Sequence, residues 1–369
     1  MPFILSAELL PEHAGGLQAV CCLSPSVLVS GGDDGAVFVW RRDGGSPPPA
    51  FSAASQVTGH VKSVRAISAL PRSPSLPSGG FATGCLDGLV RVFAYDAGGE
   101  AAPALVRTLT GHTAGVTSLS LTACGTRLLS GGWEGVARVW DLASGACVAV
   151  LGGHENGTCV LGLPNGDIAV GSTGRKSEDN RHVDYKLRLW RSTASPTGPA
   201  GGFAVARVLE DHDQAVRDLA LLPGGGGFVS VGNDGAVKVR DLDGTARATY
   251  VNPASAEGKP HSCFRVTAAS CVGGIGGPLV ITANEDESVR IIDLASGAIE
   301  TIRLPGARGW WGGGAHDPEL PLRCRASFTL STDTDATPAN SCLPPFSPPP
   351  PPCPPRPHFR HAVGSCDAA

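Results

Sequence analysis

A histidine, a serine and an acidic residue of one segment are spaced so that they could lie together in the folded chain. They are His112, Ser130 and Glu134, and in isolation such a set could form the catalytic triad of a hydrolase. The same residue types recur three more times: His13, Ser30 and Asp34; His60, Thr83 and Asp87; and His212, Ser230 and Asp234. An enzyme needs one such set in one pocket, so the repetition predicts a structural role and no enzymatic activity.

The repetition extends along most of the chain. An acidic residue precedes a hydrophobic strand-like segment six times, at Asp34, Asp87, Glu134, Asp184, Asp234 and Asp286. The steps between these acids are 53, 47, 50, 50 and 52 residues. A histidine stands before each acid, at His13, His60, His112, His154, His212 and His261. A regular period of this length indicates that each repeat is one supersecondary unit.

The elements within each repeat are predicted to be β-strands. The segments "AVFVW", "VARVW" and "KLRLW" alternate apolar and polar residues, while "LQAVCCL" and "VRDLALL" are nearly continuous apolar runs suited to inner strands. Asp-Gly pairs follow at 34–35, 87–88 and 234–235 and favour two-residue hairpins. The fold class is therefore all-β.

Composition limits the function classes. Only 17% of the 369 residues are charged and the net charge is −4, so nucleic acid is not an expected partner. No apolar run of 18 residues and no basic N-terminal cluster is present, so neither a membrane span nor a signal peptide is predicted. The 12 cysteines form no CxxC pair, which favours reduced thiols in the cytoplasm or nucleus and no metal site. The glycine-rich stretches at 223–228 and 273–277 lack Gly-Lys-Ser/Thr, so no cofactor is expected.

Several of these features resemble the WD-repeat family, in which each unit forms one four-stranded blade of a β-propeller. They are the Gly-His pairs at 59–60, 111–112 and 153–154, the tryptophans that end three repeats, and the Trp-Asp pair at 140–141. The resemblance implies a hydrogen-bond network within each blade, made by His13, Ser30, Asp34, Trp40, His60, Thr83, Asp87, His112, Ser130, Glu134, Trp140, His212, Ser230 and Asp234.

The chain departs from the family pattern in four blades. Phe93, Arg240 and Ile292 stand where a tryptophan is usual, and an insertion within 170–190 displaces the serine of the fourth blade. We expect these blades to be held less tightly than the first and third. The insertion is interpreted as a solvated loop, with a partner-docking loop as the alternative.

The predicted blades lie near 13–46, 60–96, 112–145, 154–192, 212–244 and 261–297, within a propeller domain of residues 1–308. The family implies seven blades, so the last one is incomplete. "FILSAELL" at 3–10 is expected to be the outer strand that closes it, and "AIETIRLPG" at 298–306 to be the outer strand of blade six. Beyond Trp310 and Trp311 no strand pattern follows. The ring is then either gapped or closed under strain with six blades.

The C-terminal segment 309–369 is predicted to be a disordered Gly/Pro-rich tail. Eleven prolines fall between Pro338 and Pro357, a composition that favours extended polyproline structure or disorder over a packed core. Two alternatives are a proline-rich ligand for a small domain and a non-native end from an unspliced or misread gene segment.

Residues just before the repeated acids are predicted to form a ring around the channel mouth, which is the expected partner-binding rim. They are Asp33, Leu86, Trp133, Val183, Asn233 and Glu285. Trp133 is conspicuous, because an indole on an exposed turn either serves a partner or packs on a neighbouring blade.

A more specific resemblance, over about residues 3–310, is to the N-terminal propeller of phospholipase A-2-activating protein and its fungal relative, the ubiquitin-fusion-degradation factor. It is carried by "LLSGGWEG" at 128–135, "AVRDLA" at 215–220 with a later "ND", and "TIRLP" at 301–305 followed by a tryptophan. The resemblance implies a non-catalytic adaptor that binds ubiquitin or ubiquitinated proteins in protein degradation and ubiquitin homeostasis. The family also binds an AAA-type segregase ATPase, but the domain that does so is absent from this sequence. The alternative is a WD-repeat scaffold unrelated to ubiquitin.

Overall fold

The computed structural model describes residues 13, 14, 16–42, 51–98, 101–176, 182–183, 185–193, 202–251, 266–274, 277–284 and 288–303. The predicted tail at 309–369 and the strand expected at 3–10 lie outside these residues, as do His261, Asp184, Glu285 and Asp286.

The first three four-stranded antiparallel sheets follow the chain in order. Sheet 1 consists of β1 (Leu17–Ser24), β2 (Val27–Gly32), β3 (Val37–Arg42) and β4 (Phe51–Val57). Sheet 2 consists of β5 (Val64–Leu70), β6 (Gly80–Cys85), β7 (Val90–Ala94) and β8 (Ala104–Leu109). Sheet 3 consists of β9 (Val116–Leu121), β10 (Arg127–Gly132), β11 (Ala137–Asp141) and β12 (Cys147–Leu151).

Three more sheets of the same kind follow. Sheet 4 consists of β13 (Thr158–Gly162), β14 (Ile168–Ser172), β17 (Leu187–Ser192) and β18 (Phe203–Leu209). Sheet 5 consists of β19 (Val216–Leu221), β20 (Phe228–Gly232), β21 (Ala236–Arg240) and β22 (Ala246–Val251). Sheet 6 consists of β23 (Val266–Gly274), β24 (Gly277–Asn284), β25 (Ser288–Asp293) and β26 (Ile299–Arg303).

The remaining described elements are small. The insertion of the fourth repeat forms a hairpin of β15 (Arg175–Lys176) and β16 (His182–Val183) between two strands of sheet 4. A single 3-10 turn, η1, spans Pro223–Gly225. The all-β propeller predicted from the repeats is confirmed.

Each range predicted from the repeated residues holds the first three strands of a sheet, and the fourth strand follows it. In sheet 1 the predicted range ends at residue 46, and β4 begins at Phe51. The outer strands carry none of the marked histidines, acids or tryptophans, so the repeat pattern does not locate their ends. The segment at 298–306 does contain the outer strand of sheet 6, because β26 pairs with β25.

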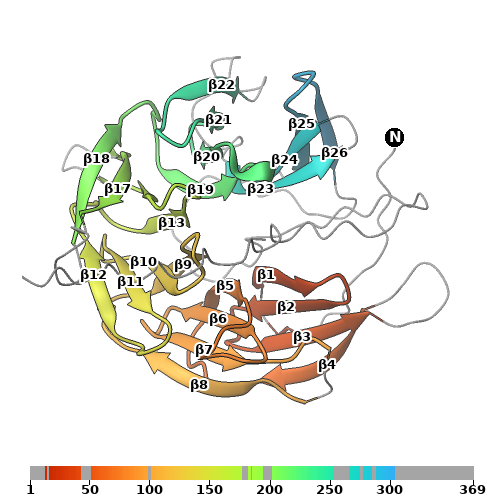
Figure 1. Cartoon of the computed structure of the whole chain (residues 1–369). Coiled ribbons are helices and arrows are strands. Elements are labelled where there is room, and N and C mark those ends of the chain that lie inside the picture. The colour runs from red at the N-terminus through yellow and green to blue at the C-terminus, as the bar shows by residue number, and fades with distance from the viewer. Residues whose placement is uncertain are drawn as a thin grey trace, which may run out of the picture. The chain divides into compact units, whose positions relative to one another are not determined.

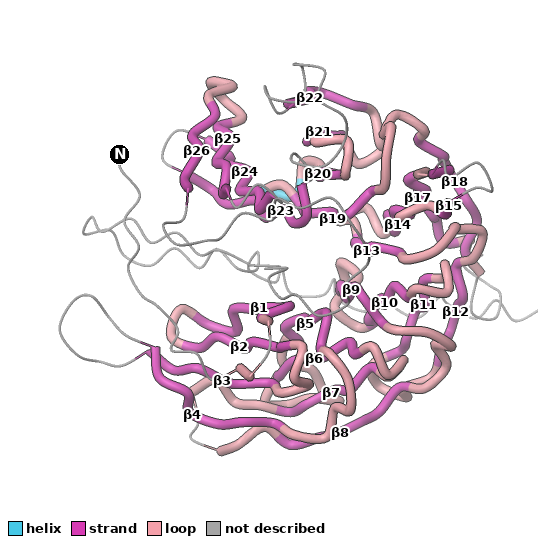
Figure 2. The backbone as a smooth tube through the Cα atoms, turned by 180° about the vertical axis from the view of Figure 1, so that it is seen from behind, coloured by secondary structure: helices cyan, strands magenta, loops and turns pink. Residues whose placement is uncertain are grey.

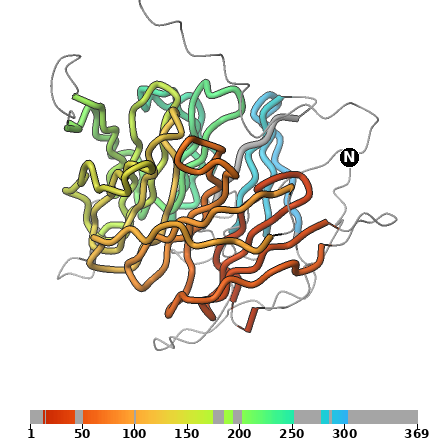
Figure 3. The backbone as a smooth tube through the Cα atoms, turned by 60° about the horizontal axis from the view of Figure 1, so that its bottom comes forward, coloured from red at the N-terminus to blue at the C-terminus, as the bar shows by residue number. Residues whose placement is uncertain are grey.

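Neighbouring sheets contact one another through their first strands. β1 lies beside β5, β5 beside β9, β9 beside β13, β13 beside β19 and β19 beside β23. Figure 1 shows the sheets following one another in chain order with these strands innermost, and Figure 2 shows the same order from behind. In the turned view of Figure 3 the same succession runs from red to blue. Sheet 1 and sheet 6 are therefore the first and last sheets of the described array.

The core lies between sheets. Val29 and Val39 of sheet 1 pack against Phe81 and Phe93 of sheet 2, and Trp140 of sheet 3 packs on the opposite face of sheet 2. Within the described ranges, the cluster of Ala36, Phe38, Trp40, Leu28 and Phe51 draws on sheet 1 alone. Sheets 2 to 5 thus each bury an apolar face against the sheet before and another against the sheet after, as inner members of a stacked array require.

Candidate functional site

Sheet 3 contains the candidate triad, and the structure shows how its members are used. The hydroxyl of Ser130 lies 2.6 Å from His112 Nε2, and Trp140 Nε1 donates to the same oxygen at 2.7 Å. His112 Nδ1 is hydrogen-bonded to the carboxylate of Glu134. One arrangement satisfies every group: the indole N–H donates to Ser130, the serine hydroxyl to Nε2, and Nδ1–H to Glu134.

The electrostatics of this chain fit an ordering role. Burial opposes ionisation of Glu134, but the hydrogen bond and charge of His112, together with backbone hydrogen bonds, outweigh it and hold the pKa of that carboxyl below its usual value. Ser130 is completely buried, and its hydroxyl is bonded on both sides. A nucleophilic serine must instead reach a substrate carbonyl. The set therefore joins the rim turn to the core tryptophan.

Sheet 1 repeats the arrangement. His13 Nε2 lies 2.8 Å from Ser30 Oγ, Trp40 Nε1 donates to that oxygen at 2.7 Å, and His13 Nδ1 lies 3.1 Å from Asp34 Oδ1. The backbone N–H of Ala36 also donates to the Asp34 carboxylate. Burial by itself would raise the pKa of Asp34, but the hydrogen bonds to its carboxylate lower the pKa below its usual value.

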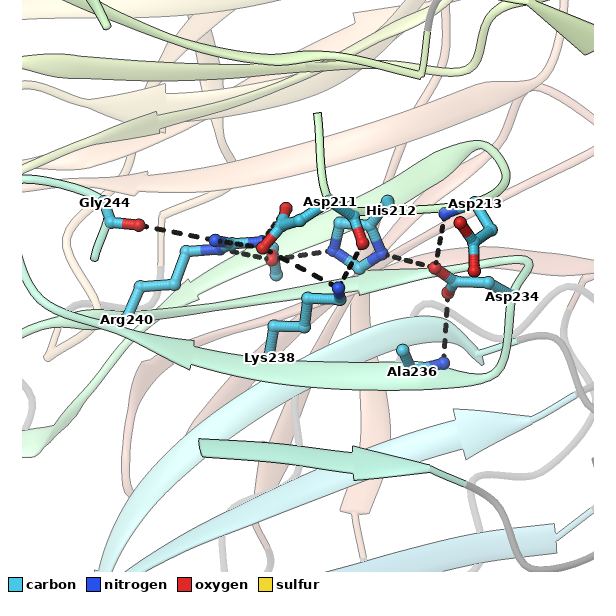
Figure 4. Close-up of polar contacts among 9 residues, drawn as sticks. Asp211, His212, Asp213, Asp234, Ala236, Lys238, Arg240 and Gly244 are labelled. Atoms are coloured by element: carbon cyan, nitrogen blue, oxygen red, sulfur yellow. Dashed lines mark hydrogen bonds and ion pairs between the residues drawn. The ribbon is translucent and has the colours of Figure 1, made fainter. Parts of the chain in front are cut away.

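Sheet 5 completes the network without a tryptophan. His212 lies 2.9 Å from Ser230 Oγ through Nε2 and 2.8 Å from Asp234 through Nδ1. Arg240, which is 1% exposed, donates from Nε to Ser230 at 2.9 Å. Its two terminal nitrogens donate to the carboxylate of Asp211 at 2.9 and 2.7 Å, as Figure 4 shows. The interpretation of Arg240 as a break in the pattern is thus corrected: its guanidinium replaces the indole as donor.

Sheet 2 keeps only part of the network. His60 Nε2 lies 2.8 Å from Thr83 Oγ1, but Asp87 pairs with Arg91 at 2.9 Å instead of with the histidine. Phe93, which cannot donate, packs beside His60. Burial, reinforced by the nearby Arg91 charge, lowers the pKa of His60 to about 4.

Sheet 4 lacks the hydroxyl. Val170 stands opposite Arg188, just as Ser130 stands opposite Arg138 in sheet 3, and Ser172 donates instead to the backbone oxygen of Glu155 at 2.6 Å. This agrees with the predicted displacement of the serine. Arg188 donates to His154 Nδ1 at 3.2 Å. Burial, followed by the Arg188 charge, lowers the pKa of His154 to about 3.

One backbone hydrogen bond defines the rim in five sheets. The backbone N–H of the first residue after β2, β6, β10, β14 or β20 donates to the carbonyl oxygen of the residue that directly precedes the innermost strand of the same sheet. The bonds run from Asp33 to Gly16, Leu86 to Ser63, Trp133 to Gly115, Thr173 to Gly157 and Asn233 to Ala215, at 2.8 to 2.9 Å. We call Asp33, Leu86, Trp133, Thr173 and Asn233 the rim row.

The rim row corrects one predicted position. Thr173, and not Val183, occupies the place in sheet 4, because the inserted hairpin lies between Thr173 and β17 and carries Val183 in β16. Glu285, the rim residue predicted for sheet 6, lies outside the described residues.

The rim side chains differ in how they are held. Asp33 accepts hydrogen bonds from Gln18 at 2.6 Å and from Ser63 of sheet 2 at 2.7 Å, and Asn233 accepts one from Arg217 at 2.7 Å. Leu86 is half-buried. Trp133 is 46% exposed, and its indole also lies against Gly157 of the next sheet. One part of the Trp133 side chain therefore packs on the neighbouring sheet, and another part is available to a partner.

Sequence reasoning did not identify Val61 as part of this rim. Val61 is 80% exposed in the loop between β4 and β5, two residues before Ser63, whose carbonyl holds the N–H of Leu86. An apolar residue directly after a Gly-His pair was the signal that could have found it.

The described residues form neither a metal site nor a membrane-spanning helix. No group of three or more His, Cys, Asp or Glu side chains there could hold a metal ion. No described helix is long and apolar enough to cross a bilayer. Cys85, Cys124 and Cys147 are free thiols.

The family model for the WD domain, G-beta repeat, matches residues 6–41, 103–141 and 204–241. These segments end within or just after the third strands of sheets 1, 3 and 5, the sheets with complete networks. Nuclear distribution protein nudF of Aspergillus niger is 25% identical over 253 residues, covering 65% of this chain and 52% of that protein. The ribosome biogenesis protein WDR12 homolog of Chlamydomonas reinhardtii is 31% identical over 173 residues, covering 43% and 35%. The chain spans about half or less of the length of these relatives.

Among solved structures, the WD40 β-propeller domain of Doa1 is similar, with a TM-score of 0.59 and 22% identity. The similarity covers 80% of this chain and 85% of that domain. Doa1 belongs to the phospholipase A-2-activating protein family that the sequence resembles. The chain is a WD-repeat β-propeller whose fold resembles that of the Doa1 propeller domain.

Proposed function

We propose that this propeller is a non-catalytic adaptor that binds ubiquitin or ubiquitinated proteins through its rim, in ubiquitin-dependent protein degradation and ubiquitin homeostasis. The observation that carries the proposal is the half-exposed indole of Trp133. Tryptophan is enriched among the residues that dominate binding energy at protein interfaces. The resemblance to the phospholipase A-2-activating protein family supplies the choice of ubiquitin.

The neighbours of Trp133 support an apolar contact surface. Leu86 lies next along the rim row, and Val61 lies in the loop that holds Leu86. Hydrogen bonds and packing connect these residues in turn: Leu86 bonds to Ser63, its side chain lies against Gly115, and Gly115 bonds to Trp133. A partner with an apolar patch of similar extent suits this arc of sheets 1 to 3.

The absence of catalysis is part of the proposal. Its support is the repetition of the His–Ser–acid set in three sheets, each with a buried serine bonded to a core side chain. We propose a cytoplasmic or nuclear location because the 12 cysteines form no CxxC pair, a usage typical of proteins with reduced thiols.

Titration of isotope-labelled mono-ubiquitin with the purified protein tests the proposal. We expect chemical-shift changes that saturate, and about 30-fold weaker binding by Trp133→Ala, the effect of losing one interface anchor. Val150→Ala is the matched control, because Val150 is an exposed apolar residue of the outer strand of the same sheet. No shift at high micromolar concentration, or equal affinity of Trp133→Ala and wild type, would reject ubiquitin binding at this rim.

The second candidate is a WD-repeat scaffold that binds other proteins. It is favoured by relatives whose names concern nuclear distribution and ribosome biogenesis. Affinity purification separates the two: ubiquitin and degradation factors should dominate the recovered proteins under the first proposal, and components of another assembly under the second.

A further inference from the structure

Three rim side chains, those of Asp33, Leu86 and Trp133, each reach one particular residue of the following sheet, the one that directly precedes its inner strand. Ser63 precedes β5, Gly115 precedes β9 and Gly157 precedes β13. Asp33 accepts a hydrogen bond from Ser63 Oγ. Leu86 lies against Gly115, and Trp133 lies against Gly157. A polar rim side chain therefore meets a hydroxyl, and the two apolar ones meet glycines.

The backbone does not explain these glycines. The corresponding residues of sheets 2 and 5 are Ser63 and Ala215, whose carbonyls accept the same rim hydrogen bond as Gly115 and Gly157. Neither Gly115 nor Gly157 has φ in the left-handed region. A side chain is thus compatible with the backbone at this position, and the reason for glycine must lie in what surrounds it.

What surrounds Gly157 is the indole of the neighbouring sheet. A Cβ atom on Gly157 would lie 3.0 Å from Trp133 Cδ1, 3.2 Å from Thr173 Oγ1 and 3.6 Å from Trp133 Nε1. The first distance is tighter than ordinary van der Waals contact, so the ring would have to move. At Gly115 a Cβ would lie 2.6 Å from Leu86 Cδ2 and 3.1 Å from Leu86 Cα. The same relation therefore occurs twice along the apolar part of the rim.

We propose that Gly157 is a positioning residue for Trp133: its bare backbone lets the indole lie along the rim, with one part packed and the other presented to the partner. The effect of this positioning on partner binding rests on the proposed function. An interface side chain that is already held in its bound position loses less conformational freedom on association. Gly115 holds Leu86 in the same way.

Fluorine NMR of protein labelled with 5-fluorotryptophan tests the positioning directly. The chain has six tryptophans, and the signal of residue 133 is the one missing from Trp133→Phe. We expect Gly157→Ala to shift this signal. Gly152→Ala is the matched control, because Gly152 lies in the same loop between β12 and β13, outside the left-handed region, with no atom near its missing Cβ. An unmoved signal in Gly157→Ala, or an equal shift in Gly152→Ala, overturns the positioning role.

Binding of mono-ubiquitin tests the consequence. We expect Gly157→Ala to weaken binding about threefold or more, a coupling typical of residues in contact, and to change nothing in a Trp133→Ala background. Equal weakening in both backgrounds would show that Gly157 does not act through the indole and would overturn the inference. If the wild-type protein binds no ubiquitin, the proposed function fails, while the fluorine signal still decides whether Gly157 positions Trp133.

Discussion

The guanidinium of Arg240 donates a hydrogen bond from Nε to Ser230 Oγ at 2.9 Å, in the place where the indole of Trp140 donates to Ser130 at 2.7 Å. An arginine brings a charge into this buried position that a tryptophan does not. Asp211 balances the charge by accepting from both terminal nitrogens. Sheet 5 therefore depends on a carboxylate that sheets 1 and 3 do not need.

The first prediction concerns this pair. Asp211→Asn leaves a buried cation without its anion and should lower the free energy of unfolding by about 3 kcal/mol. Arg240→Met should have a smaller effect, because the Asp211 side chain is 41% exposed and water can hydrate it. Urea denaturation of the two variants and the double variant measures this. The double variant should be more stable than Asp211→Asn, and an additive loss would contradict the role of the charge.

The second prediction concerns acid. Burial holds the pKa of His60 at about 4 and that of His154 at about 3, below the 6.5 of an exposed histidine. Between pH 6.5 and those values the unfolded chain binds protons that the folded chain does not. The two buried, neutral histidines therefore make their full contribution to the free energy of unfolding above pH 6.5. This contribution decreases as the pH falls toward 4 for His60 and 3 for His154. Chemical denaturation at a series of pH values should show this decline.

A histidine variant provides the control for that decline. His60→Asn keeps a polar side chain beside Thr83 but cannot titrate in this range. Its stability should be lower than that of wild type at pH 7, and its decline from pH 6.5 to 4 should be shallower. If the slope is unchanged, His60 does not contribute to the acid sensitivity.

The third prediction is a stabilising substitution in sheet 4. Within the described part of the chain, His154 Nε2 and Trp190 Nε1 are buried without a hydrogen-bond acceptor. The indole Nε1 of Trp190 always carries hydrogen, and His154 Nε2 carries it because the other ring nitrogen, Nδ1, accepts from Arg188. Val170→Thr keeps the shape of valine and adds the hydroxyl that Thr83 supplies in sheet 2, so the free energy of unfolding should rise by about 1 kcal/mol.

Val160→Thr is the matched control for this substitution. Val160 is buried in the same apolar cluster as Val170. A hydroxyl there should lower stability in thermal and urea unfolding, because Val160 lies on the innermost strand β13, whereas the network hydroxyls of Ser30, Thr83, Ser130 and Ser230 all come from the second strand of their sheets. Equal effects of the two substitutions would mean that the nitrogens of His154 and Trp190 do not gain an acceptor.

Much of the fold follows from the sequence because the repeated residues mark the same places in each sheet. The steps between the acids located the rim turns, and the serines and tryptophans identified the bonded pairs of sheets 1 and 3. Val183 was misplaced because spacing alone counts an inserted hairpin as part of the turn. The structure shows Thr173 there instead, identified by its bond to Gly157.

Other features of the site depend on residues outside the repeated positions, or on residues of a neighbouring sheet. Arg240 looked like a loss because its partner, Asp211, precedes the histidine and belongs to no repeated position. Gly157 belongs to no repeated motif, and the indole that lies against it comes from the preceding sheet. Arg240 and Gly157 each contact a residue that is not at the matching position of the repeat, so an alignment of the repeats does not reveal their roles.

The direction of the hydrogen bonds in sheets 1, 3 and 5 gives the rim an electrical pattern. In each of these sheets the donors point from the core toward the rim and end on a carboxylate, Asp34, Glu134 or Asp234, whose pKa is lowered. In sheet 2 the carboxylate of Asp87 pairs with Arg91, and in sheet 4 the residue after the rim residue Thr173 is Gly174, which has no carboxylate. Among sheets 1 to 5, a carboxylate that is bonded to a histidine and not to an arginine therefore stands in every second sheet, and each of the three holds a negative charge next to the rim.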